Sequence, residues 1–125
     1  MASTITASTL KVTIREDIKL NGVDQGGVNK FSIDSINEIS KRIITITTTE
    51  SVIATFSSAV ASAGHYVASD VRYIRFTNLD DTNFLTLTFR NQDNDEVAFK
   101  LDAGRSFVWN GDNVDGMTAV LNATQ

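Results

Sequence analysis

The stretch NQDND, followed by Glu96, places three carboxylates within four residues. Carboxylate oxygens are ligands that Ca²⁺ prefers in proteins, and a second acidic stretch, NGDNVDG, could supply two more. Neither stretch has the spacing of an EF-hand loop, and Asn and Asp also favour tight turns because their side chains bond their own backbone. The sequence therefore predicts turns here and no metal site. The calcium alternative would use Asp93, Asp95, Asp112 and Asp115.

Catalytic chemistry has little support in the sequence. His65 is the single histidine, and no G-x-S-x-G motif is present to supply a nucleophile. The chain has no Cys, which excludes disulfides, thiolate metal sites and Cys nucleophiles. Trp109 could form a sugar platform, but its apolar neighbours Phe107 and Val108 favour a place in the core or a subunit interface. The sequence predicts a protein that is not an enzyme and needs no cofactor.

Charge and hydropathy restrict the partners. The formal net charge of -4 would repel a phosphate backbone, and Lys41 and Arg42 form the only adjacent basic pair. No window reaches the roughly 18 apolar residues of a membrane span. We therefore expect neither nucleic acid nor a membrane as partner. The triplet NAT at 122–124 matches a glycosylation sequon, which matters only in a secreted eukaryotic protein.

Residues 10–20 alternate between apolar and polar side chains, which is typical of a strand with one face on a core and the other in solvent. Glu16 interrupts the apolar face and predicts a bend, a bulge or a break between two short strands. NGVDQGG then supplies turn residues, and a second alternation begins at Phe31 and Ile33. The run RIITITTT is β-branched almost throughout and predicts a further strand.

The region 52–63 fits two structures, because its apolar residues could line a short helix near 57–63 or SVIATF could form a strand. The signal is clearer at 84–90 and 96–101, where alternating residues flank NQDND and predict a hairpin. VRYIRF, SFVW and MTAVL predict further strands. An up-and-down strand order would bring the loop at 110–116 to the same end as NQDND.

Short strands separated by turn signals, without a long helical period, predict an all-β fold. We expect a single antiparallel β-sandwich or a partly closed, jelly-roll-like barrel of about seven to nine strands. The domain is expected to span residues 10–125. Residues 1–9, rich in Ala, Ser and Thr, are expected to form a flexible N-terminal arm, either frayed or ordered against a neighbouring subunit.

Two long stretches carry a resemblance to a known class of proteins. They are LKVTIREDIKLNGVDQGGVNKFSIDSINEISKRIITI and DVRYIRFTNLDDTNFLTLTFRNQDNDEVAFKLDAGRSFVW, and together they lie within residues 10–109. They resemble small structural proteins of tailed bacteriophage particles, particularly those of phages of marine and cyanobacterial hosts. The resemblance implies a β-rich, cofactor-free virion subunit, present in many copies, that is assembled in the host cytoplasm and contacts the major capsid protein or tail and neck proteins.

The expected function is that of a non-enzymatic virion structural protein, most simply a capsid decoration or cement subunit. A place in the tail, neck or baseplate is the alternative within this class, and a carbohydrate-binding module is the alternative of another class. We also expect a closed homo-oligomer, because the chain has no Pro to blunt its sheet edges and ITITTTE carries no charge before Glu50. A trimer is favoured, since the virion resemblance would place it at three-fold positions.

Overall fold

The computed structural model describes residues 6–58, 64–111, 114 and 118–125. The described residues form eleven strands and one short 3-10 helix, so the predicted all-β fold is confirmed. Contacts along the chain divide it into two compact units, Met1–Arg42 (unit 1) and Ile43–Gln125 (unit 2). The prediction that residues 10–125 act as one domain stays a prediction.

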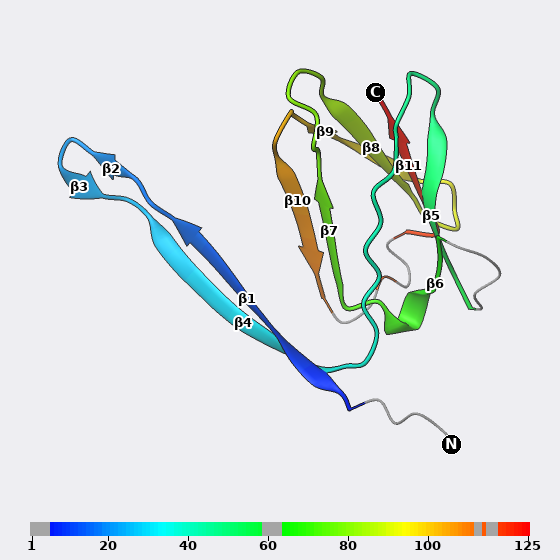
Figure 1. The fold of residues 1–125 in the computed structure, drawn as a ribbon, viewed down its shortest axis with the longest axis horizontal. Coiled ribbons are helices and arrows are strands. Elements are labelled where there is room, and N and C mark those ends of the chain that lie inside the picture. Colours follow the sequence, from blue (N-terminus) through cyan, green and yellow to red (C-terminus); the bar gives the residue numbers. More distant parts are fainter. Residues whose placement is uncertain (1–5, 59–63, 112–113, 115–117) are drawn as a thin grey trace. The chain divides into compact units, whose positions relative to one another are not determined.

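Unit 1 is a long hairpin (Figure 1). Its strands are β1 (Ser8–Glu16), β2 (Lys19–Leu20), β3 (Val23–Asp24) and β4 (Gly27–Ile36). β1 pairs antiparallel with β4, and β2 pairs with β3 at the tip. Asn21 and Gly22 turn the chain there with φ of 52° and 79°, the left-handed values that an Asn-Gly hairpin turn requires. The predicted interruption at Glu16 is confirmed, because β1 ends at that residue.

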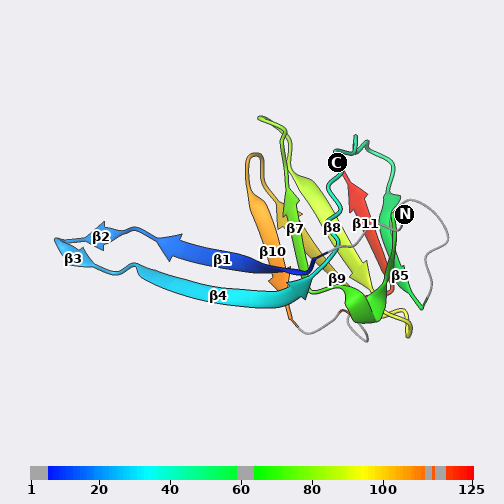
Figure 2. The same ribbon diagram turned by 60° about the horizontal axis from the view of Figure 1, so that its bottom comes forward.

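Unit 2 consists of two antiparallel layers, apart from one short parallel pair (Figure 2). The first layer has the strand order β6-β5-β11-β8-β9 and the second pairs β10 with β7. The bounds are β5 (Ser51–Ser57), β6 (His65–Val67), η1 (Ala68–Asp70), β7 (Tyr73–Thr77), β8 (Leu85–Arg90), β9 (Glu96–Leu101), β10 (Ser106–Asn110) and β11 (Val120–Thr124). The two layers form a sandwich-like fold and no closed barrel.

The core of unit 2 lies between these layers. Leu87 and Phe89 of β8 and Leu121 of β11 are buried within the five-stranded sheet. Phe107 of β10 packs against them from the second layer, with its ring centroid 5.5 Å from that of Phe89. Aromatic and aliphatic side chains from both sheets therefore share one apolar interior, as in other sandwiches.

The hairpin predicted around NQDND is confirmed by the pairing of β8 with β9, in which Leu85 lies opposite Leu101 and Phe89 opposite Val97. The up-and-down strand order is wrong. After β9 the chain moves to the other sheet, where β10 pairs with β7, and β11 then returns to lie between β5 and β8. Alternation identifies the face of a strand but not its neighbours, since the pairing of distant strands depends on how the whole core packs.

The strand predicted at RIITITTT is wrong, because residues 37–50, all of which the structure describes, contain no strand. Ile46 packs against the core of unit 2, whereas Ile43 is 89% exposed. The Thr47 carbonyl accepts a hydrogen bond from the Gln125 N–H at 2.8 Å. β-Propensity reflects packing on a half-buried pleated surface in pairing with neighbouring strands, and residues 37–50 form no such ladder. The edge strand expected at ITITTTE, one argument for a homo-oligomer, is therefore wrong as well.

Two smaller predictions concern segments that are described only in part. SVIATF forms strand β5, which ends at Ser57, and residues 59–63 of the possible short helix lie outside the described residues. In the predicted N-terminal arm, Ser8 and Thr9 belong to β1, while residues 1–5 lie outside the described part of the chain.

Candidate functional site

The NQDND loop is organised by the side chain of Asn91. Its Oδ1 accepts hydrogen bonds from the backbone N–H groups of Asp93 at 2.9 Å and Asp95 at 3.0 Å. The Asn91 N–H in turn donates to the Asp95 carbonyl at 3.1 Å, and Asn94 takes a left-handed φ of 64°. Asn side chains commonly stabilise tight turns by accepting such bonds from the backbone of the same loop. The predicted turn is therefore stabilised by residues of the loop itself.

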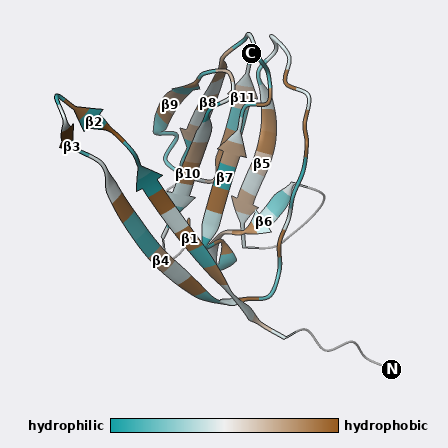
Figure 3. Ribbon diagram, turned by 60° about the vertical axis from the view of Figure 1, so that its left-hand side comes forward, coloured by the Kyte–Doolittle hydropathy of each residue, from teal (hydrophilic) through white to brown (hydrophobic). Residues whose placement is uncertain are grey.

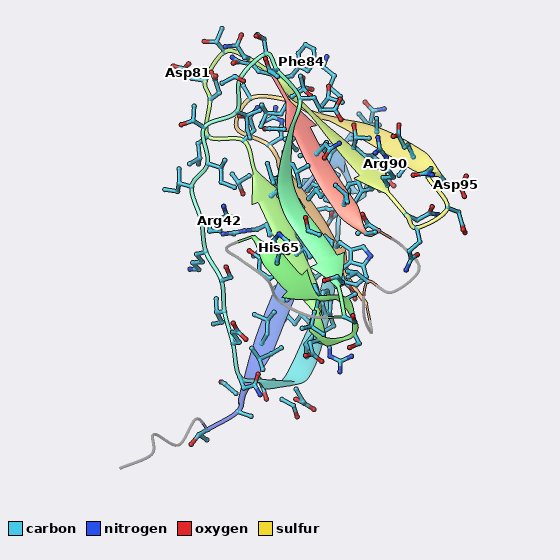
Figure 4. All side chains as sticks on the ribbon, turned by 90° about the vertical axis from the view of Figure 1, so that its right-hand side faces the viewer. Arg42, His65, Asp81, Phe84, Arg90 and Asp95 are labelled. Atoms are coloured by element: carbon cyan, nitrogen blue, oxygen red, sulfur yellow. The ribbon has the colours of Figure 1, made fainter. Side chains whose placement is uncertain are left out.

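Among the residues that the structure describes, no group of three or more His, Cys, Asp or Glu side chains could hold a metal ion. Asp93 and Asp95 lie in the loop after β8, and the acidic loop that contains Asp81 precedes that strand, so the two loops lie at its opposite ends (Figure 4). Asp112 and Asp115 lie outside the described residues. The absence of a calcium site stays a prediction.

We expect millimolar CaCl₂ to change the melting temperature by less than about 1 °C, because a ligand raises it only by binding the folded state. Differential scanning fluorimetry with MgCl₂ at equal ionic strength is the measurement and its control. A rise of several degrees that disappears in Asp93→Asn would instead identify Asp93 as a calcium ligand.

The loop between β7 and β8 is built on Asn78, which is only 3% exposed. Its Nδ2 donates to the carbonyls of Asn83 at 2.9 Å and Leu101 at 3.2 Å. The Asp80 carboxylate accepts a bond from the Thr82 N–H at 2.8 Å, and this bond, with further bonds from Asn83, lowers the pKa of Asp80 from its ordinary value of 3.8. Asp80 therefore stabilises the local conformation of this loop.

Asn78→Ala is expected to lower the free energy of unfolding by about 1 to 3 kcal/mol, because it removes the Nδ2 donor from the buried bond to the Leu101 carbonyl and from the part-buried bond to the Asn83 carbonyl. Urea denaturation followed by circular dichroism measures this loss. The matched control is Asn83→Ala, whose side-chain bond to Asp80 is exposed and whose loss should cost less than about 0.5 kcal/mol. Equal losses in the two variants would contradict the structural role of Asn78.

The remaining residues considered for chemistry lie in separate parts of unit 2. His65 begins β6, at one edge of the five-stranded sheet (Figure 4). Trp109 lies opposite Ile74 and packs against the core. Asn122 of the NAT sequon is only 8% exposed, in the central strand β11, and its Nδ2 donates to Glu50 Oε1 at 2.7 Å. A glycosylation acceptor needs a surface loop, which this position is not.

The hairpin of unit 1 carries an apolar face that no other element of unit 1 covers. Directly opposed residues of an antiparallel pair point to the same face, and the register places Leu10 opposite Ile33 and Val12 opposite Phe31. None of residues 6–42 is buried. Figure 3 shows the alternation of apolar and polar residues along β1 and β4. We define the hairpin face as Leu10, Val12, Ile14, Phe31, Ile33 and Ile36.

A β-bulge keeps Ile36 on this face. The register shifts between Ser8 and Leu10, so that one residue of β1 faces two residues of β4. Ser35 is one of these two and has a left-handed φ of 62°. Without the extra residue, the period of two would turn Ile36 to the opposite face. The bulge therefore extends the apolar face to the end of the hairpin.

The opposite face of the hairpin is basic. It presents Lys11 and Arg15 from β1 and Lys30 from β4, between the neutral residues Thr13, Val28 and Ser32, together with one acidic residue, Asp34, whose carboxylate accepts a hydrogen bond from the Thr9 hydroxyl at 3.1 Å. Arg15 forms an exposed ion pair with Asp17 at 3.1 Å. The paired segments 10–14 and 29–33 thus place their charges on one face and leave the hairpin face uncharged.

Unit 2 also presents sheet edges. β6 and β9 are the outer strands of the larger sheet, and β7 and β10 pair with each other. On β9, Glu96 accepts a hydrogen bond from Arg90 at 2.7 Å, and the ammonium of Lys100 lies 4.6 Å from the centre of the Phe84 ring. These charged side chains flank the exposed β9 edge and reduce unwanted strand pairing, as edge charges do in other sheets.

No protein-family model, curated protein or solved structure matches this chain. Among the described residues, no helix has the length and apolar character needed to cross a membrane. The fold and surfaces define an all-β protein in which a sandwich-like unit is joined to a two-stranded hairpin whose apolar face has no second layer among the described residues of unit 1. The alternation of residues 10–20 predicts a strand with one face on a core, and the described residues of unit 1 provide no second layer for that face.

Proposed function

We propose that this chain is a non-enzymatic structural subunit of a multi-copy assembly and that the hairpin face is an assembly surface. The observation that supports this is a hairpin with two strands, a continuous uncharged apolar face and no buried residue among 6–42. A two-stranded hairpin is marginally stable in water, so it needs a second layer of apolar residues to become rigid. A contiguous apolar face that lacks a second layer within its own unit is a candidate interaction site.

Within this role, we propose a virion structural protein of a tailed phage, placed on the capsid as a decoration or cement subunit in contact with the major capsid protein. The support is the resemblance of the two stretches within residues 10–109, the first of which contains the whole hairpin. A place in the tail, neck or baseplate is the alternative in the same class. We also propose that the subunit is a closed homo-oligomer, with three copies favoured by three-fold sites on a capsid.

The test is to purify particles from the phage that encodes the chain and to locate the chain in them. Quantitative mass spectrometry should detect it at a fixed ratio to the major capsid protein after density-gradient purification, with a non-structural phage protein as the negative control. Cryo-electron microscopy then distinguishes the capsid surface from the tail or neck. Absence of the chain from purified particles would refute the virion proposal.

A glycan array tests the competing class, a carbohydrate-binding module. We expect no binding signal from the folded chain. A signal lost in Trp109→Ala, with the circular dichroism spectrum unchanged, would support sugar binding in place of an assembly role.

A further inference from the structure

We infer that the hairpin face packs against the hairpin faces of further copies of this chain, around the symmetry axis of a closed homo-oligomer. This inference rests on the proposed structural role, and it names both the surface and the partner. It follows from the charge pattern of the hairpin, the size of its apolar face and the lack of a second layer in unit 1.

The hairpin face requires a partner surface without charges. Burying an unpaired charge is strongly unfavourable, so the covering surface must be apolar and uncharged over the whole length of the face. Another copy of the hairpin meets this requirement, because its face has the same length, the same twist and no charge between residues 10–14 and 29–33. Copies of this face directed toward one axis can pack with about 10 Å between neighbouring backbones, the spacing of packed sheets in a sandwich.

The basic face determines which side of the hairpin meets another copy. Two basic faces in contact would bring Lys11 and Lys30 of one copy against the same residues of the next, and like charges disfavour that arrangement. Packing through the hairpin face leaves these lysines in water. Association through one face of each hairpin, directed toward a common axis, closes the oligomer and does not propagate into a filament.

The size of the hairpin face sets the strength of the association. Seven residues of β1 span about 24 Å, and two paired strands are about 10 Å wide, so the face covers on the order of 250 Å². A stable interface buries roughly 800 Å² on each partner. We therefore expect association of the free protein to depend on concentration, and to be favoured where many copies are held close together.

Single-cysteine variants test the packing, because the chain has no Cys of its own. Val12 lies at the centre of the hairpin face, and Thr13 is the next residue, on the basic face. Disulfide formation requires the two Cβ atoms to approach closely, so mild oxidation at several hundred micromolar protein should link Val12→Cys chains about tenfold faster than Thr13→Cys chains.

A matched pair of charge variants tests the energetics. Val12→Lys places an ammonium in the proposed interface, whereas Thr13→Lys places the same group among existing lysines. Sedimentation velocity from 10 µM to 1 mM should show the wild type moving from 13.6 kDa toward three times that mass. Val12→Lys should raise the midpoint concentration more than about tenfold, and Thr13→Lys by less than about twofold. Trp109 fluorescence verifies that unit 2 stays folded in both variants.

A wild-type mass of one chain at all concentrations, with equal oxidation of the two cysteine variants, would overturn the inference. That result is expected if unit 2 of the same chain or a different protein covers the hairpin face. An oligomer that Val12→Lys does not weaken would also overturn the inference. The exposed edge of β9 would then be the next candidate interface. Either outcome leaves the virion proposal standing, since presence in the particle is measured independently.

Discussion

Leu121→Ala is expected to lower the free energy of unfolding of unit 2 by about 3 to 5 kcal/mol. Leu121 is 0% exposed and lies in β11, the central strand of the five-stranded sheet, opposite Ala54 on one side and Phe89 on the other. Truncation removes apolar contacts and leaves a cavity that the paired neighbouring strands prevent from closing. Urea unfolding followed by the fluorescence of Trp109, the single tryptophan, measures the loss.

The matched control is Leu79→Ala, the same substitution at a side chain that is 73% exposed. Its expected effect is below about 0.5 kcal/mol, because little apolar area is lost. If the two variants unfolded at the same urea concentration, the placement of Leu121 at the centre of the core would be incorrect.

Gly26→Ala is expected to abolish the ordered pairing of β1 with β4. A Cβ atom at Gly26 would lie 1.9 Å from the Glu16 carbonyl oxygen. That oxygen belongs to the backbone at the end of β1, so relief of the clash requires the two chain segments to separate. A cost of about 3 kcal/mol or more exceeds what a marginally stable two-stranded hairpin can tolerate.

Amide hydrogen exchange at Val12 and Phe31 measures this effect, because both lie in the β1–β4 ladder. Protection should fall to that of an unfolded peptide in Gly26→Ala and change less than about twofold in Gly27→Ala, the control. A Cβ at Gly27 would meet no atom within 4 Å. Similar exchange in both variants would contradict the close approach at Gly26. Exchange in unit 2 should be the same in all three proteins.

Leu121→Ala and Gly26→Ala act on different units of the molecule, so their effects can be measured separately. Leu121→Ala tests a core built from strands distant in sequence, whereas Gly26→Ala tests the close approach of two backbone segments within one hairpin. Gly26→Ala could also reduce the mass that sedimentation velocity measures at high protein concentration. That result would link the order of the hairpin to self-association and support the proposal that the hairpin face is an assembly surface.

The sequence by itself determined the local features of the protein. The break at Glu16, the Asn-Gly turn at the hairpin tip and the hairpin around NQDND were all predictable, because each depends on alternation or turn chemistry within about ten residues. The absence of a long helical period also sufficed for the all-β class.

The tertiary structure decided which surfaces these elements cover. RIITITTT has high β-propensity but forms no strand, and β11 inserts between β5 and β8 although neither is its neighbour in sequence. The alternation from Leu10 shows that one face of that strand is apolar, yet it does not reveal that, among the described residues, the strand pairs only with β4 and lacks a second layer in unit 1. The reason is physical: alternation is a property of one strand, whereas burial depends on contacts between segments that the chain brings together only when it folds.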